Sequence, residues 1–414
     1  MRGTMDKPLL IVVASSYAAF RSYIFRAVTT RYRLWLLNPT PPTWEQPYIE
    51  GHTVVDCLDL DALTAAAAAV AHEHKVAGFF CYDEVYVETA AWAGAALGLT
   101  TLDPAAIARC RDKTATRQAL EKAGIPQPAS QAVASLDEAR AFAARVGHPV
   151  ILKPRNLGGS LGLRKVEDPA DLEAAFEVTS GVGVPGIHRF EDGVIVEEFL
   201  DGPEVSVDSV VFEGDCTPMI VGRKVLGDTE AMAFEEIGHD VDGADPLLDD
   251  PDVVDLVRRT HAALGFDNGF THAEYKVTPK GLQLIEVNAR LGGGMIPYLG
   301  MLTSGTNAVL AAADVAVGRR PTVEFPDPRR AASVRFAYPA FDMEVTTSRA
   351  REELLVPPVY EMGMSAVPGG TVRLPPRGLA RSGYVIAVAP SLEESRAALA
   401  DPARFFEITG RPLQ

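Results

Sequence analysis

The stretch from Thr271 to Gly294, reading THAEYKVTPKGLQLIEVNARLGGG, constrains the fold of this chain more than any other. Two short segments of alternating apolar and polar residues flank Pro279-Lys280-Gly281. Proline favours the start of a turn and glycine accepts a positive φ, so these residues predict a three-residue hairpin loop. Pairing of Thr278 with Leu282 then sets the register and decides which side chains face each other.

In this register Glu274 lies directly opposite Glu286, and His272 lies opposite Asn288. Facing like charges destabilise a sheet and acidic residues are uncommon in strand centres, so a cation is expected between the carboxylates. Two carboxylates and an amide oxygen are hard ligands, typical of Mg²⁺ or Mn²⁺ with phosphate oxygens completing the shell. A solvated face with harmless charges is the alternative. Arg290, on the same face of the strand, favours a ligand site.

The bulk composition indicates a multidomain protein that acts on small molecules. At 414 residues the chain exceeds what one core normally serves, so two or three domains are expected. A net charge of -16 argues against nucleic acid or an anionic membrane as the main partner. The four cysteines lack CxxC spacing, which indicates a reducing compartment. Without a signal-peptide pattern or an apolar run near about 18 residues, the expected location is the cytoplasm.

Residues 8 to 100 alternate apolar strands with helical stretches, which predicts a parallel α/β domain at residues 1–109. The expected strands are Leu9 to Ala14, Arg33 to Leu37, Thr53 to Cys57 and Val76 to Tyr82, and the expected helices are Asp61 to His74 and Glu84 to Leu97. The first turn, Ala14 to Tyr17, has no glycine fingerprint, so no dinucleotide is assigned to it. Asp103-Pro104 predicts the start of a linking helix.

Residues 110–318 are predicted to form an α+β nucleotide-binding domain with a lid subdomain at about 110–196. Capping signals at Ser135 and Asp168 open two helices. The expected strands before the hairpin are Val150 to Lys153, Val194 to Glu197 and Glu204 to Val211. The proline- and charge-rich residues 319–330 indicate a linker into a small α+β domain that ends the chain at residue 414.

Two lysines and a glycine-rich loop are candidates for phosphate binding. The chain has no GxxxxGK[ST] motif, which excludes a P-loop, and the GxGxxG at residues 181–186 follows a helix and is interpreted as a flexible loop. Lys153 ends a strand beside the loop at residues 158–162, where an ammonium and backbone amides suit polyphosphate. A surface lysine beside a flexible turn explains the same residues taken alone, and Lys113 is equally unremarkable by itself.

The segment from Val194 to Glu204 reads as a strand, a hinge and a second acidic residue. Backbone groups at such a hinge pair with a purine edge, and the Glu204 carboxylate is suited to accept hydrogen bonds from two ribose hydroxyls. A plain β-turn explains these residues about as well. Only the combination of motifs discriminates between the two interpretations.

The order of these motifs over roughly residues 110 to 310 resembles the ATP-grasp superfamily. The resemblance implies a fold of mixed α/β and α+β class, in which a central ATP-grasp domain follows an N-terminal Rossmann-like parallel domain and precedes a small C-terminal α+β domain. The tail beyond residue 318 is similar to that of the L-amino-acid ligase branch.

By this resemblance, each site residue takes a family role. Lys113 and Lys153 contact phosphates, and Gly158, Gly159 and Ser160 belong to a flexible phosphate lid. The adenine hinge comprises Glu197, Glu198, Phe199 and Leu200, and the ribose carboxylate is Glu204. The metal ligands are Glu274, Glu286 and Asn288, and the residue that stabilises the acyl-phosphate and tetrahedral intermediates is Arg290.

The resemblance implies that a substrate carboxylate attacks the γ-phosphate of ATP to give an acyl phosphate and ADP, and that an amine then displaces phosphate. Two Mg²⁺ or Mn²⁺ ions bridged by Glu286 would neutralise phosphate charge. His272 lies where relatives often place a basic residue. It would contact the transferred phosphoryl group or help to accept the amine proton, and a neutral histidine that fills the strand is the alternative.

The substrate pocket is predicted from Arg290 and the backbone amides of Gly293 and Gly294, which would hold a carboxylate and a developing oxyanion. Glycine at position 294 leaves space that a bulky side chain would have narrowed. A segment from position 223 to 239 resembles the loop that lines the amino-acid site in similar ligases, and its candidate residues are Arg223, Glu235, Glu236 and His239. Either glutamate would bind an ammonium, and ordinary surface charge is an equal alternative.

The leading hypothesis is an ATP-dependent ligase that joins amino acids, or acids that resemble them, to an amine. A biotin-carboxylase or purine-biosynthesis type of ATP-grasp enzyme is the nearest alternative. A nucleotide-binding regulatory protein without turnover is the third, and Arg290 argues against it because a pure binder has little use for this arginine. The expected partners are small-molecule carboxylates and amines, with neither nucleic acid nor membrane, and a homodimer stays open.

Overall fold

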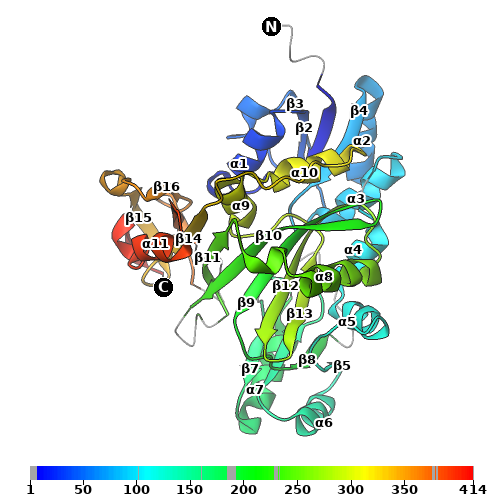
Figure 1. Cartoon of the computed structure of the whole chain (residues 1–414), viewed down its shortest axis with the longest axis vertical. Coiled ribbons are helices and arrows are strands. Elements are labelled where there is room, and N and C mark those ends of the chain that lie inside the picture. The colour runs from blue at the N-terminus through cyan, green and yellow to red at the C-terminus, as the bar shows by residue number, and fades with distance from the viewer. Residues whose placement is uncertain are drawn as a thin grey trace.

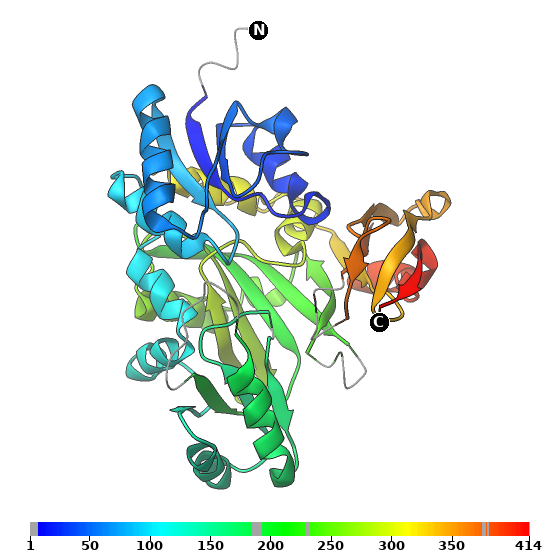
Figure 2. The same cartoon turned by 180° about the vertical axis from the view of Figure 1, so that it is seen from behind.

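The computed structural model describes residues 7–100, 102–159, 161–183, 193–227, 232, 234–374, 378 and 381–413. In Figure 1 the blue N-terminal part lies at the top, the cyan-to-green residues 113–198 lie at the bottom, and the orange-to-red C-terminal part forms a lobe at the left. A long green-to-yellow sheet runs between them. Figure 2, from behind, shows that all three parts border this central sheet.

The N-terminal part is the parallel α/β unit that the sequence predicts. Its elements are β1 (Leu9–Val13), α1 (Ala18–Val28), β2 (Arg33–Asn38), β3 (Gly51–Val54), α2 (Leu60–Glu73), β4 (Val76–Cys81) and α3 (Val87–Ala96). The strand order is β3-β2-β1-β4. Helix α1 was not predicted, because it starts at Tyr17 without a side-chain cap. Strand β3 begins two residues earlier than expected.

The next part covers the residues for which a lid subdomain is predicted. Its elements are α4 (Pro104–Arg111), α5 (Lys113–Lys122), β5 (Ser130–Val133), α6 (Leu136–Val146), β6 (Val150–Pro154), β7 (Arg164–Val166), α7 (Leu172–Gly181) and β8 (Val194–Glu198). The sheet order is β5-β8-β6-β7. The predicted capping box is confirmed, because the Ser135 hydroxyl accepts a hydrogen bond from the Glu138 amide. Asp112 caps α5 and also binds Arg155 through both carboxylate oxygens at 2.7 Å, which fixes the start of this helix beside β6.

The central sheet is antiparallel and joins the middle of the chain to its C-terminal part. Its strands are β9 (Glu204–Phe212), β10 (Asp215–Leu226), β11 (Glu236–Asp242), β12 (Gly269–Thr278), β13 (Gly281–Asn288), β14 (Ala331–Ala337), β16 (Val359–Met364) and β18 (Gly383–Ala389). Their order is β13-β12-β9-β10-β11-β14-β18-β16. Helices α8 (Pro251–Leu264), α9 (Ile296–Ser304) and α10 (Ala308–Ala316) pack on it. The expected substrate loop at positions 223 to 239 is thus largely the strand pair β10 and β11.

The end of the chain adds a small sheet, β17-β15-β19, and one further helix. These elements are β15 (Met343–Ala350), β17 (Thr371–Val372), α11 (Leu392–Ala398) and β19 (Phe406–Pro412). Strand β14 pairs with β11, so the C-terminal strands β14, β16 and β18 extend the central sheet. The C-terminal part is therefore held directly against the strand that carries Glu236 and His239.

The hairpin of β12 and β13 has the predicted facing pairs but a different turn. Thr278 pairs with Gly281 and not with Leu282, so the loop contains two residues and the predicted three-residue loop is wrong. A bulge between Glu274 and Tyr275 shifts the register by one residue. The two deviations cancel, and Glu274 lies opposite Glu286 as predicted.

One hydrophobic core spans the N-terminal sheet and the central sheet, which fixes the two parts against each other. It contains residues from β1, α1, β9, α9, α10 and β14. The four cysteines are free, as the absence of CxxC spacing predicts. Within the described parts of the chain, every helix is too short or too polar to cross a bilayer.

Strand β4 packs so closely on α10 that Gly78 cannot carry a side chain. A methyl group there would lie 2.0 Å from the carbonyl oxygen of Ala316. We therefore expect Gly78→Ala to lower the free energy of unfolding by about 1–3 kcal/mol, because packed backbone cannot move aside. Urea denaturation of both proteins measures the difference. Gly181→Ala is the matched control, since a methyl group there meets nothing within 4 Å; equal unfolding midpoints for the two variants would contradict this account.

Candidate active site

A buried ion-pair triad joins the lid strands to α5. Lys153 on β6 lies 2.5 Å from one carboxylate oxygen of Glu197 on β8, and Arg117 on α5 donates to the other oxygen at 2.7 Å. Burial alone would raise the pKa of Glu197, but Arg117 and Lys153 hold it at about 2. The Glu197 side chain is thus engaged by two cations. Its backbone is part of the central strand β8, where Glu197 pairs with Ser130 on one side and Ile151 on the other.

The rest of the predicted adenine hinge follows β8. Glu198 accepts a hydrogen bond from the Ala129 amide at 3.3 Å, and the Lys165 ammonium lies 4.3 Å from the ring centre of Phe199. Leu200 is half-buried.

Lys113, the second predicted phosphate lysine, links the lid loop to the hairpin. Its ammonium donates to the Leu157 carbonyl at 2.6 Å and lies 3.6 Å from Oε2 of Glu286. A methyl group on Gly158 or Gly159 would meet nothing within 4 Å, so the backbone of this loop is open to a ligand. Ser160 lies outside the described residues. One cavity is lined by Lys113, Gly158, Glu286, Asn288 and Glu84.

The residues in this cavity fit a hard cation. The Asn288 amide places one terminal atom 3.0 Å from Oε1 of Glu286 and 3.3 Å from Oε2 of Glu84. When the NH₂ group of Asn288 occupies this position, it donates to both carboxylates. When the amide oxygen occupies it, three oxygens converge as they do around Mg²⁺. The predicted ligands Glu286 and Asn288 are therefore placed together.

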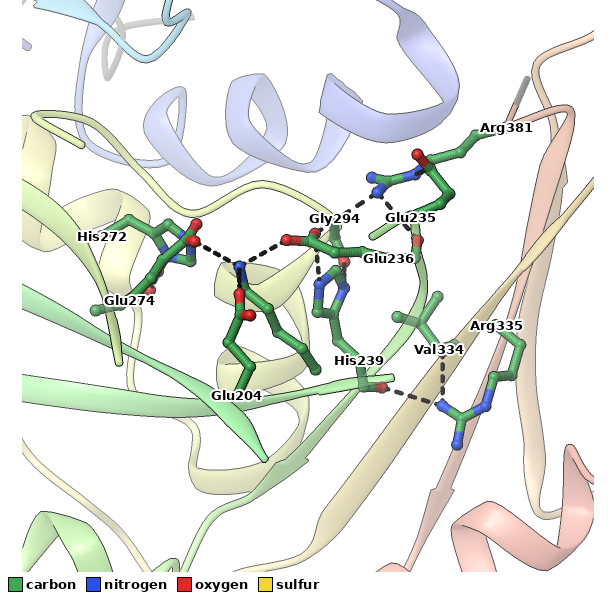
Figure 3. Close-up of polar contacts among 12 residues, drawn as sticks. Glu204, Glu235, Glu236, His239, His272, Glu274, Gly294, Val334, Arg335 and Arg381 are labelled. Carbon is green, nitrogen blue, oxygen red and sulfur yellow. Dashed lines mark hydrogen bonds and ion pairs between the residues drawn. The ribbon is translucent and has the colours of Figure 1, made fainter. Parts of the chain in front are cut away.

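Glu274, the third predicted ligand, lies in a different set of contacts. The carboxylates of Glu204, Glu236 and Glu274 gather around the ammonium of Lys224 at 2.6, 2.7 and 2.7 Å. Figure 3 shows the three glutamates converging from neighbouring strands. Burial disfavours the charge of Lys224, but the carboxylates raise its pKa well above the usual value, and the pKa of Glu274 falls to about 2. Each carboxylate of the facing pair thus has its own lysine.

Lys224 is a site residue that the sequence analysis missed. Its side chain is only 2% exposed, and it comes from β10, which was interpreted as part of a loop. The alternation of a strand would have placed Lys224 and Arg223 on opposite faces. Glu204, the predicted ribose carboxylate, binds Lys224 and also lies 3.3 Å from Lys276.

Arg223 was predicted to line the substrate pocket, and the structure corrects this. Its guanidinium binds both oxygens of Asp245 at 2.7 and 3.0 Å. Because successive side chains of β10 point to opposite faces, Arg223 is turned away from the site that Lys224 faces. Arg223 was assigned to the substrate pocket because it lies close in sequence to Glu235 and Glu236. The alternation of side chains along β10 places it on the other face of the sheet.

His272 lies between two carboxylates. Its Nδ1 is 2.6 Å from Asp208, and its Nε2 is 3.1 Å from Glu274. Burial opposes protonation, but Asp208 and Glu274 raise the pKa of His272 to about 9. Asp208 also accepts a hydrogen bond from the Gly292 amide at 3.2 Å. This buried aspartate, which the sequence analysis missed, therefore orients both the histidine and the glycine loop.

The predicted substrate residues Glu236, His239 and Gly294 are in contact. Nε2 of His239 lies 3.0 Å from Glu236, and Nδ1 lies 3.0 Å from the carbonyl oxygen of Gly294. A methyl group on Gly294 would meet the imidazole ring at 2.0 Å. The space at position 294 is thus occupied by His239, which corrects the expectation of an open pocket there. Gly293 has nothing within 4 Å of a built methyl group, so its backbone is open.

The C-terminal part reaches this site, which the sequence analysis did not foresee. The Tyr338 hydroxyl donates to Glu235 at 2.7 Å, and the Arg381 guanidinium lies 3.4 Å from the same carboxylate. Arg381 also donates to the Glu236 carbonyl at 3.0 Å. Figure 3 shows Arg381 approaching the two glutamates from the C-terminal strands. Glu235 is therefore committed to this contact, while Glu236 faces Lys224.

Arg290 connects the central sheet to the N-terminal part. Its Nε lies 3.1 Å from Glu84, and a terminal nitrogen donates to the Leu291 carbonyl at 3.0 Å. Glu84 also lies 3.4 Å from Arg111. The sequence analysis missed Glu84 because its partner is more than two hundred positions away.

Comparison with known proteins agrees with this arrangement. Residues 146–297 match the ATP-grasp domain family. A protein of Sinorhizobium fredii described only as uncharacterized is 27% identical over 92% of this chain and 79% of its own length. Alanine–anticapsin ligase of Bacillus subtilis is 30% identical over a region that covers 54% of this chain and 52% of that ligase. The crystal structure of L-amino acid ligase from Bacillus licheniformis superposes with a TM-score of 0.80 at 21% identity, covering 98% of this chain and 99% of the other.

Residues 146–297 therefore form an ATP-grasp domain, and this segment contains the hairpin of β12 and β13. Within the ATP-grasp superfamily the similarity of the chain lies with the L-amino-acid ligase branch, as the resemblance of the sequence implied. The mixed α/β and α+β fold class is confirmed.

The triad at Glu197 generates a stability prediction. We expect Glu197→Gln to lower the free energy of unfolding by about 3–5 kcal/mol, because it leaves Lys153 and Arg117 buried without a counter-charge. The loss is expected in urea denaturation at pH 7. Glu198→Gln is the matched control, because its half-exposed side chain makes a single hydrogen bond with the backbone.

The same variants test the pKa of Glu197. A folded-state pKa near 2, below the ordinary 4.5, makes the wild-type protein lose stability as the pH falls from about 4.5 towards 2. Glu197→Gln lacks this group, so its deficit relative to wild type is expected to shrink over that pH range. A deficit that stays constant over this range would show that folding does not lower the pKa of Glu197.

Proposed function

We propose that this protein is an ATP-dependent carboxylate–amine ligase that joins amino acids, or acids that resemble them, through an acyl phosphate. The observation that carries the proposal is the juxtaposition at the end of the hairpin. Lys113, Glu286 and Asn288 line one cavity together with Glu84, and Arg290 lies 3.1 Å from this Glu84. Glu274, which faces Glu286, belongs to the adjoining buried cluster of Lys224 and its three carboxylates. The cavity that would hold the phosphates thus borders a cluster whose charged side chains could bind the ammonium or carboxylate of an amino acid.

ATP would lie between the lid and the central sheet. Lys113, Lys153 and the open backbone around Gly158 are suited to hold its phosphates, and the backbone after Glu197 is suited to the adenine. Mg²⁺ or Mn²⁺, as two ions held by Glu274, Glu286 and Asn288, would supply neutralisation of phosphate charge. To bind the ion, Glu274 would have to break its ion pair with Lys224. Glu204 would likewise have to break its ion pair with Lys224 to accept hydrogen bonds from the ribose.

The reaction has two balanced steps. A carboxylate oxygen of the first substrate attacks the γ-phosphorus, the bond to the β–γ bridging oxygen breaks, and ADP leaves. The amine nitrogen of the second substrate then attacks the acyl carbon, the C–N bond forms, and phosphate leaves as the nitrogen loses a proton. Arg290 is placed to stabilise the oxyanion of the tetrahedral intermediate.

The role of His272 follows from its contacts. Both ring nitrogens face carboxylates, those of Asp208 and Glu274, so each nitrogen is best matched by a proton. His272 is therefore suited to hold negative charge on the transferred phosphoryl group. This geometry does not favour the second role considered for it, acceptance of the amine proton.

Arg381 reaches both glutamates, at 3.4 Å from Glu235 and 3.6 Å from Glu236. Glu236 is the better candidate to bind an ammonium on the substrate, because it alone of the two belongs to the cluster around Lys224. We further propose three domains, with boundaries near residues 110 and 319.

The free cysteines support a reducing compartment such as the cytoplasm. The assembly state, monomer or homodimer, is measured directly by light scattering.

Incubation of the protein with ATP, Mg²⁺ and a pool of amino acids, followed by mass spectrometry, tests the reaction. We expect ADP release that depends on the amino acids, together with a product whose mass equals two substrates less one water. Turnover that depends on bicarbonate without any amino acid would favour a carboxylase type of ATP-grasp enzyme instead. Nucleotide binding without ADP release would favour a regulatory protein.

A substitution tests the cation ligands. We expect Glu286→Ala to reduce ADP formation by at least about a hundredfold, since Lys113 loses a partner and the cation a carboxylate. Circular dichroism checks that the variant is folded. Glu121→Ala, an exposed site on the helix that begins with Lys113, is the matched control and is expected to keep wild-type activity. Full activity of Glu286→Ala would refute the assignment of this carboxylate.

A further inference from the structure

The strand order of the N-terminal sheet reverses at β1, near Arg290. In the order β3-β2-β1-β4, the chain leaves β1 towards β2 on one side, and β4 lies on the other side of β1. Ligands of parallel α/β sheets bind at such a reversal, outside the carboxyl ends of the two strands. After β4 comes Glu84, which lies 3.1 Å from Arg290. The reversal point therefore borders the proposed reaction site.

Two polar side chains of α1 are buried at this place without partners. Nη1 of Arg21 and the hydroxyl of Tyr23 are inaccessible to solvent, and within the described residues each lacks a hydrogen bond of good geometry, although the Arg21 side chain lies close enough to the Tyr23 hydroxyl to lessen the rise of its pKa on burial. Tyr23 is only 3% exposed. Buried polar groups are almost always hydrogen-bonded, and one left unpaired costs about 1–3 kcal/mol. Two such donors on one helix indicate a polar ligand.

The charge of Arg21 identifies that ligand as an anion. Within the described residues its guanidinium has no carboxylate partner; it lies 5.7 Å from the ring centre of Tyr82 and beside the Tyr23 side chain. The Tyr82 hydroxyl is engaged by the Ser15 carbonyl at 2.7 Å. Burial raises the pKa of Tyr23 to about 12, and Arg21 opposes this rise, so the two groups are neighbours. A cation and a neutral donor side by side suit a carboxylate.

The contacts of α1 place this pair beside the reaction site. The Tyr23 ring stacks on Tyr298 of α9 with ring centres 5.1 Å apart, and α9 directly follows the glycine loop. The ring of Phe20 packs against that of Phe336, with ring centres 6.1 Å apart. The ring of Phe336 packs in turn against that of His239, with ring centres 5.8 Å apart. Helix α1 therefore borders the wall that carries the proposed amino-acid residues.

We propose that Arg21, assisted by the Tyr23 hydroxyl, binds the free carboxylate of the second substrate, the acceptor amino acid. This inference rests on the proposed ligase function. The acceptor attacks with its amine, so its own carboxylate keeps its charge during the reaction and needs a cation inside the site. Arg290 is occupied with the acyl carbon of the first substrate. Arg21 is the further cation that the topology places on the facing wall.

The test separates the two halves of the reaction. With hydroxylamine in place of the acceptor, the acyl phosphate is trapped as a hydroxamate, and no acceptor carboxylate takes part. We expect Arg21→Met to leave hydroxamate formation unchanged while raising the KM for the acceptor amino acid roughly 10- to 100-fold. Tyr23→Phe is expected to raise the same KM by less. The acceptor is the one identified by mass spectrometry in the pooled reaction.

Matched controls and an altered acceptor sharpen the result. Arg26→Met removes an exposed arginine from the same helix and is expected to change neither rate. A second comparison uses the acceptor amino acid with its carboxylate converted to an amide. Wild type is expected to have a higher KM for this amide than for the acid, whereas Arg21→Met is expected to have similar KM values for both. An equal loss of hydroxamate and peptide in a folded Arg21→Met protein, or an unchanged acceptor KM, would overturn the proposal.

Failure of the ligase function itself gives a different pattern. If wild type forms neither hydroxamate nor peptide, the proposed reaction is wrong. Binding of a carboxylate at Arg21 is then tested separately, by measuring the melting temperature with pooled amino acids and with their amides. Stabilisation of wild type by the acids alone, lost in Arg21→Met and kept in Arg26→Met, would support the site. No difference between the acids and the amides would refute it.

Discussion

The neutralisation of buried carboxylates by Lys224 is the interaction on which the geometry of the central site depends. Four adjacent strands, β12, β9, β10 and β11, each contribute one member of this cluster. Without the ammonium, three glutamates within a few ångströms of one another would repel strongly in a medium of low polarity. The lysine thus fixes how these strands lie relative to one another, and it brings the amino-acid residues next to the hairpin.

A second constraint connects the three parts of the molecule at Phe336. This ring contacts Phe20 of the N-terminal helix α1 and His239 of the central sheet, and the Arg381 guanidinium lies 4.3 Å from its centre. Because the large core also spans the N-terminal and central sheets, these contacts are held by packing and not by a flexible linker. The wall opposite the phosphate site is therefore assembled from residues that are distant in sequence.

Much of the fold and about half of the site could be predicted from local patterns. The hairpin was predictable because alternation and turn residues act over short distances, and the pairing of Glu274 with Glu286 survived because the shorter loop and the bulge compensate. Lys224 and Asp208 were missed because their partners lie on other strands. Glu84 and Arg21 were missed because the order of strands in the N-terminal sheet, which no local pattern reveals, decides what they face.

The charged side chains proposed to bind the ligands are paired with one another in this structure. Lys153 is paired with Glu197, Lys113 with Glu286, and Lys224 with Glu274, so the groups proposed for phosphates and cations are already matched. Binding of a nucleotide with its cations would therefore exchange partners, and phosphate would take the lysines as the metal takes the carboxylates. Such an exchange keeps every charge compensated at each stage. Among the described residues Arg21 has no carboxylate to exchange, which distinguishes it from the lysines of the site and supports its assignment to an anionic ligand.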